Sequence, residues 1–114
     1  MLRTLFYLVA FCGLILNTGS TRKVYDPCKI FGVVYVEKNP RYAHFKVHEE
    51  SSEAFADVLI FEEENRLYAD KQGLWSFTDK KEFADFYIYW EKQKGLADFS
   101  VYFTDFESFA GCNK

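Results

Sequence analysis

The fold is decided by a stretch that reads SEAFADVLIF, from Ser52 to Phe61. A short polar segment leads to an aromatic residue, an alanine and an aspartate, and then to an apolar run that is typical of a β-strand. The same order of residue types recurs along the chain. Its alanines are Ala43, Ala56, Ala69, Ala84, Ala97 and Ala110, at spacings of 13, 13, 15, 13 and 13 residues. This period predicts a repeat protein with six copies of one short unit.

Three positions around each alanine keep their chemical type. The residue before it is large and apolar: Tyr42, Phe55, Tyr68, Phe83, Leu96 and Phe109. The residue after it is aspartate in four copies (Asp57, Asp70, Asp85 and Asp98) and is His44 or Gly111 in the others. Nine residues before it stands another apolar side chain: Val34, Val47, Ile60, Trp75, Ile88 and Val101. Three columns that hold through six copies exclude coincidence.

Each copy predicts one strand and one short helical turn. The strands are expected at 33–36, 45–47, 58–61, 86–90 and 99–103, where β-branched and aromatic residues gather. The polar segments between them are expected to be single helical turns whose aromatic–alanine pair packs on the sheet, because alanine permits a close approach. About eight residues then link successive strands, fewer than a parallel crossover to a neighbouring strand needs. We therefore expect a β-rich α+β repeat, compact and closed, whose path forms a ring or skips neighbouring strands.

The N-terminal segment indicates export. Residues 1–20 have the features of a secretory signal peptide: Arg3, an uncharged apolar run over 5–16, and small residues at 17–20. A membrane anchor is the main alternative, but twelve apolar residues rise only about 18 Å as a helix. A lipid attached to Cys12 is the other, although bulky Phe11 precedes that cysteine. We expect cleavage, a short linker at 21–27, a repeat domain over 28–114, and a secreted or periplasmic product without stable membrane insertion.

Cleavage leaves the even pair Cys28 and Cys112. In an oxidising compartment such a pair predicts one disulfide, which would tie the start of the domain to its end. Closure of so long a loop stabilises a small domain by roughly 4–5 kcal/mol in the chain-entropy model. The alternative is a pair of unpaired or metal-bound thiols.

The repeated block resembles the family of septoil-knot domains. The matching stretches are 52–57, 81–85, 95–98 and 73–75, together with the opening 28–32. The first copy departs from the pattern, with Pro40 in its turn and His44 in place of aspartate. The resemblance implies a knotted, compact repeat fold with seven crossings. It implies no catalytic residues, so it does not settle the function.

The aspartate column is the first candidate for chemistry. Four carboxylates at one repeat position could hold calcium or form an acid–base pair, which would make the chain a small extracellular hydrolase or metal-dependent enzyme. Repetition in register favours a structural role, because catalysis needs one special site. His44 and His48 would lie roughly 13 Å apart on a strand, too far for one zinc ion. We therefore predict no enzyme activity, no catalytic residue, no metal and no cofactor.

A binding surface is the other candidate. The later copies carry Phe77, Trp90 and Phe103 where two middle copies carry Glu49 and Glu62. Either these strands are central and covered, or they expose an aromatic patch that binds a protein or a glycan. That patch would comprise Trp75, Tyr89, Trp90, Tyr102 and Phe103. The net charge of −3 argues against nucleic acid as a partner. We expect a non-catalytic domain with a binding or structural role outside the cell.

Overall fold

The computed structural model describes residues 25–113. The predicted signal peptide and most of the linker lie outside these residues. Seven strands alternate with three-residue 3-10 turns, and they are β1 (Gly32–Val36), β2 (Phe45–Glu49), β3 (Val58–Glu62), β4 (Leu74–Thr78), β5 (Phe86–Trp90), β6 (Phe99–Phe103) and β7 (Gly111–Cys112). The turns are η1 (Pro27–Lys29), η2 (Pro40–Tyr42), η3 (Glu53–Phe55), η4 (Arg66–Tyr68), η5 (Lys81–Phe83), η6 (Lys94–Leu96) and η7 (Glu107–Phe109). The five predicted strands are confirmed, whereas β4 and β7 were not predicted. No helix of residues 25–113 meets the length and apolarity that crossing a membrane requires.

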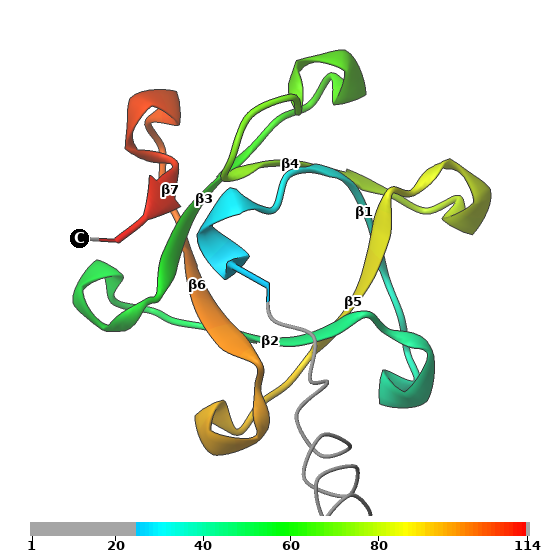
Figure 1. Ribbon diagram of the computed structural model, residues 1–114, viewed down its shortest axis with the longest axis horizontal. Coiled ribbons are helices and arrows are strands. Elements are labelled where there is room, and N and C mark those ends of the chain that lie inside the picture. The colour runs from blue at the N-terminus through cyan, green and yellow to red at the C-terminus, as the bar shows by residue number, and fades with distance from the viewer. Residues whose placement is uncertain (1–24, 114) are drawn as a thin grey trace, which may run out of the picture.

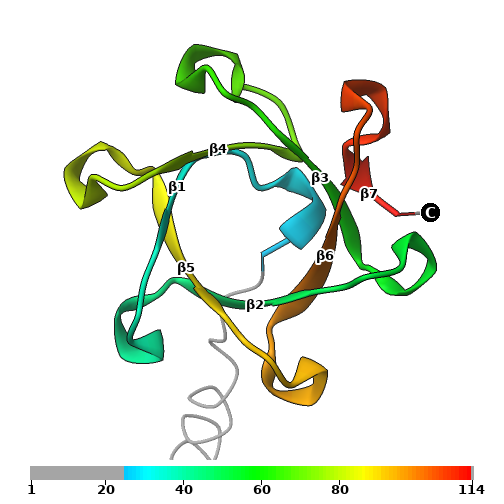
Figure 2. The ribbon, with the colours of Figure 1, turned by 180° about the vertical axis from the view of Figure 1, so that it is seen from behind.

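Six strands close into a barrel, all parallel. The order around it is β4-β1-β5-β2-β6-β3, and a further pairing between β3 and β4 closes the ring (Figures 1 and 2). Strand β7 lies outside and pairs antiparallel with the first half of β3. Successive strands from β1 to β3 and from β4 to β6 are separated by one strand, so the chain passes around the barrel twice. The second passage places its strands between those of the first, which confirms both the closed form and the skipped neighbours.

Stagger between neighbouring strands explains how such short links suffice. Ile88 of β5 pairs on one side with Val36, the last residue of β1, and on the other with Phe45, the first residue of β2. The end of one strand and the start of the next therefore stand at the same level, about 10 Å apart, which is two strand spacings. The link needs to cross one strand, and it does not have to return along the barrel.

The barrel interior is filled by one residue of each unit. The apolar column predicted nine residues before each alanine forms the middle layer, and each member has an exposed fraction of 0%: Val34, Val47, Ile60, Trp75, Ile88 and Val101. Burial of a side chain of this size stabilises the fold by about 1.5–3 kcal/mol. Trp75 is the largest member, and its Nε1–H donates to the carbonyl oxygen of Ile30 at 3.2 Å. The middle layer therefore carries the hydrophobic core.

The two mouths of the barrel are closed differently. At the start of the strands, η1 covers the opening and brings Cys28 into the core cluster (Figure 1). At the end of the strands, the rings of Phe77, Trp90 and Phe103 contact one another with centroids 5.9–6.4 Å apart. These three side chains are half-buried and pack against the core. The apolar inner face of the later strands thus serves to close the barrel.

In four units the residue after the alanine pairs with a strand of the other passage. Asp85 donates its backbone N–H to the carbonyl oxygen of Val33 at 2.7 Å, and its Oδ2 accepts the N–H of Val33 at 2.8 Å. Asp98 forms the same reciprocal pair with Lys46. The remaining pairs join Asp57 to Ser100 and His44, through Nδ1, to Tyr87. Each side chain thus extends the backbone ladder by one step before the strand begins.

The third unit, which contains Ala69, departs from this pattern. Among the described residues, Asp70 makes no such pair, and it is followed by the two extra residues of the 15-residue spacing. Gly73 then adopts a positive φ of 82°, and a Cβ there would lie 2.4 Å from the backbone nitrogen of Gly111. Only glycine permits this approach of the two passages. We call this break in the repeat the seam. On one side of it lie η4 and the loop that leads to β4, residues 66–73, and on the other side lies η7.

The packing predicted for the turns is wrong in one respect. The alanines face inward, with Ala56 and Ala69 buried and the other four half-buried. The large residues before them point to solvent, with exposed fractions of 50–66%. A three-residue 3-10 turn that projects outward can place only one side of itself on the barrel, and the small alanine takes that side. The aromatic residue is consequently left at the tip of the loop.

Replacement of the aspartates by alanine tests the paired role. Asp57→Ala and Asp85→Ala should each lower the free energy of unfolding by about 1–2 kcal/mol, because a backbone N–H at the start of a strand loses its acceptor. Asp98→Ala should lower the free energy of unfolding by less, because its hydrogen bond to Lys46 is more exposed to solvent. Asp70→Ala should change stability by less than about 0.5 kcal/mol. Urea unfolding measures all four, and equal losses would contradict the assignment.

Candidate functional site

The carboxylates of the aspartate column do not meet at one site. Each stands before a different strand, and Asp57, Asp85 and Asp98 accept a backbone hydrogen bond there. In the described part of the chain, the one group of donors close enough for a metal ion is Asp26, Cys28 and Cys112. Its two sulfurs are joined in a disulfide, with the Cα atoms 4.7 Å apart. The predicted Cys28–Cys112 pairing is therefore present, and the sulfurs are not free ligands.

The two histidines also have structural partners. His44 Nδ1 accepts the N–H of Tyr87 at 2.9 Å, and the two rings stack with centroids 4.8 Å apart. His48 Nδ1 lies 2.9 Å from the carbonyl oxygen of Glu91, which makes this nitrogen the donor. The two imidazoles thus bond to the backbone at opposite ends of β5.

The aromatic residues predicted to bind a partner do not form one surface. Trp75 is wrong as an exposed residue, because it points into the barrel and has an exposed fraction of 0%. Trp90 and Phe103 are inward residues that close the mouth, whereas Tyr89 and Tyr102 alternate to the outer face and are half-buried. Strand alternation separates these side chains onto two faces of the wall.

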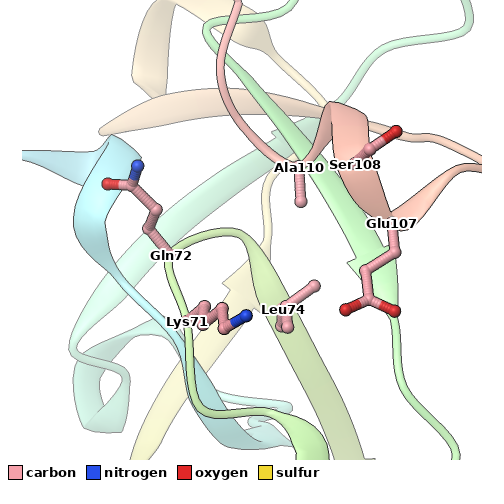
Figure 3. A pocket seen from close by; sticks show the side chains of 6 residues that line it. All are labelled: Lys71, Gln72, Leu74, Glu107, Ser108 and Ala110. Carbon is pink, nitrogen blue, oxygen red and sulfur yellow. The ribbon is translucent and has the colours of Figure 1, made fainter.

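A hollow of about 530 Å³ opens at the seam. Its walls come from the loop and strand that follow η4 on one side and from η7 on the other (Figure 3). The lining residues are Lys71, Gln72, Leu74, Glu107, Ser108 and Ala110. The hollow therefore offers one cation, one carboxylate, an amide and a hydroxyl over a small apolar floor.

The hollow lies where an ion pair of the other loops is missing. Lys81 of η5 pairs with Glu37 before η2, and Lys94 of η6 pairs with Glu50 before η3 at 2.7 Å. Thirteen residues further on, the equivalent pair would join the first residue of η7 to Glu63, which precedes η4. That position in η7 holds Glu107, and no ion pair links these two loops within residues 25–113. The loops on either side of the seam are thus left unlinked.

Exposed apolar side chains belong to the two loops whose other residues line the hollow. Leu67 and Tyr68 of η4 and Phe106 and Phe109 at η7 are each more than half exposed, and Leu67 reaches 75%. At other loops a basic residue covers the neighbouring tip: Arg66 lies 5.2 Å from the ring of Phe83. The seam therefore carries two exposed apolar pairs, one on each of its two loops. The repeat pattern did not predict this surface, although the 15-residue spacing falls at the same place.

One family model matches the chain, the 7(1) septoil knot domain, over residues 27–113. The chain belongs to this family. No curated protein and no solved structure matched it. Membership confirms the resemblance found in the repeated block and accords with the closed, β-rich repeat, while it names no ligand for the septoil knot domain.

The Lys81–Glu37 pair predicts a loss of stability at alkaline pH. The hydrogen bond that Lys81 donates to Glu37 raises the pKa of Lys81 above its usual 10.5. Desolvation of the ammonium group lowers the pKa, but this effect is smaller. A raised pKa in the folded state means that the stabilisation is complete below 10.5 and is lost as pH rises through the higher folded value. In Lys81→Met this contribution to the loss of stability at alkaline pH should be absent, whereas in Lys94→Met it should remain.

Thermal unfolding between pH 9 and 12, roughly the range in which lysine titrates, measures the effect. All other residues are shared with the wild type, so the difference between Lys81→Met and the wild type isolates Lys81, and Lys94→Met controls for the loss of a lysine. Identical alkaline profiles for Lys81→Met and the wild type would contradict the prediction.

Proposed function

We propose that the protein is a secreted or periplasmic, non-catalytic binding domain that contacts a protein partner at the seam. The observation that carries this proposal is that the two loops lining one hollow each carry an exposed apolar pair, Leu67 with Tyr68 on one and Phe106 with Phe109 on the other. Single exposed apolar residues are common, whereas adjacent ones around a polar hollow favour an interface. A protein is favoured over a glycan because Leu67 offers no aromatic face for a sugar to stack on.

The use of the carboxylates supports binding over the alternative of a small extracellular hydrolase or metal-dependent enzyme. Asp57, Asp85 and Asp98 accept backbone hydrogen bonds at three separate strands. A catalytic pair needs two carboxyl groups that face one substrate. Three of the four repeated aspartates thus have a structural use, each at its own strand.

Export is supported by two independent features. The sequence of residues 1–20 predicts a signal peptide. The Cys28–Cys112 disulfide joins residues at the two ends of the domain, as in small proteins of oxidising compartments. Intact mass of the exported protein, with and without reduction, tests both features together.

Photo-crosslinking tests the seam as the binding surface. A photoreactive side chain at position 68 or 109 should capture the same protein from the medium of the cells that carry the gene. The matched control is position 96, an exposed tip on η6 at the opposite side of the barrel (Figure 1). The captured protein should then bind the purified wild type and lose about tenfold or more in affinity to Tyr68→Ser/Phe109→Ser. Equal capture from position 96, or capture of a glycan, would contradict the proposal.

We also propose that the two interleaved passages form the knot from which the family takes its name. Strands β4 to β6 lie between strands of the first passage, so the chain end must pass through a preceding loop while folding. Threading makes folding slow beyond the effect of long-range pairing. The reduced protein should therefore refold from guanidinium over minutes, followed by tryptophan fluorescence. Refolding within about a second, the pace of ordinary small β-domains, would contradict a knot.

A further inference from the structure

Three tyrosines surround one ammonium group on the outer wall of the barrel. The Nζ of Lys81 lies 4.9 Å from the ring centroid of Tyr87, 5.7 Å from that of Tyr42 and 5.9 Å from that of Tyr35. The carboxylate of Glu37 completes the site as an ion-pair partner. These residues come from η5, β5, η2, β1 and the loop after β1, so the fold assembles the site from both passages of the chain. We call Tyr35, Tyr42, Tyr87 and Glu37 the tyrosine cage.

The next repeat shows which part of this arrangement is structural. Thirteen residues further on, Lys94 pairs with Glu50 in the same way. The positions of the three tyrosines are taken there by His48, Phe55 and Ser100. Only the ring of Phe55 lies near that ammonium group, at 6.0 Å, among the described residues. The ion pair therefore belongs to the repeat, whereas the enclosing aromatic rings occur in one copy.

The lysine that occupies the cage is more exposed than the carboxylate with which it pairs. The side chain of Lys81 is 45% exposed, and that of Glu37 is 9% exposed. Withdrawal of the lysine would leave a nearly buried carboxylate without a counter-ion beside three aromatic faces. Such a site attracts a cation from solution, because burial of an unpaired charge is unfavourable and aromatic faces attract ammonium groups. The lysine enters from the solvent side, so another ammonium group can approach by the same route.

We propose that the tyrosine cage is a binding site for a primary alkylammonium group, the lysine side chain of a partner protein, and that Lys81 is its displaceable internal occupant. The carboxylate of Glu37 favours a primary over a quaternary group, because only an ammonium with N–H bonds donates a hydrogen bond to it. The site uses none of the seam residues. The proposal therefore stands or falls separately from the proposed function.

Titration with n-butylammonium chloride tests the cage, with sodium chloride added to keep the ionic strength constant. Lys81→Ala should fold, because Lys81 is a surface residue, and should be less stable than the wild type. Butylammonium at about 1–100 mM, the range of effective concentrations of a tethered group, should raise its unfolding temperature and shift the ring resonances of Tyr35, Tyr42 and Tyr87. The matched control Lys94→Ala should show neither response. The wild type should need at least about tenfold more ligand, since Lys81 competes.

Two further arms make the result decisive. Tyr87→Leu in the Lys81→Ala protein should abolish the response while the far-ultraviolet circular dichroism is unchanged. Tetramethylammonium chloride should bind more weakly than butylammonium. Equal responses of Lys81→Ala and Lys94→Ala, or no resonance shifts, would overturn the cage. Tighter binding of tetramethylammonium would overturn the assignment to a lysine side chain. Should Lys81→Ala not fold, displacement of the Lys81 Nζ resonance in the wild type by butylammonium decides the same question.

Discussion

The stagger between neighbouring strands is the constraint on which the rest of the structure depends. It places the end of β1 and the start of β2 on either side of Ile88, so that a link of about eight residues suffices between parallel strands. A link of that length admits one 3-10 turn and one inward alanine. It also leaves a gap between successive strands that the second passage of the chain fills. The closed barrel, the outward tips and the double winding all follow from this single displacement.

Repetition builds the scaffold, and departures from repetition build the candidate sites. The buried column and the aspartate pairs recur because each unit must fill the barrel and start its strand in the same way. At the seam the spacing lengthens and Glu107 replaces the expected lysine, which leaves two loops unlinked around a hollow. At the tyrosine cage the shared ion pair has three rings around it, of which the next copy keeps one. Function is best sought where one copy differs from its neighbours.

Much of the fold could be predicted from the sequence, because each 13-residue unit supplies one strand of the barrel and one side chain of its core. The column from Val34 to Val101 was identified before the structure, as were five strands and the cysteine pairing. Strand β4 was not predicted, because Ser76 and Thr78 interrupt its apolar run. The direction of Phe55 and its equivalents was wrong, since a period does not tell which side of a three-residue turn faces the core. The cage could not be found from sequence because its members come from strands and loops that only the double winding brings together.

The most direct test of this account is a measurement of hydrogen-bond couplings across the strands by NMR. In the structure Glu37 donates its backbone N–H to the carbonyl oxygen of Ile88, and Glu50 donates to that of Val101, each at 2.7 Å. Couplings between these pairs would establish that β1 borders β5 and β2 borders β6, as the staggered double winding requires. Couplings that join β1 directly to β2 would contradict it, because successive strands would then be neighbours.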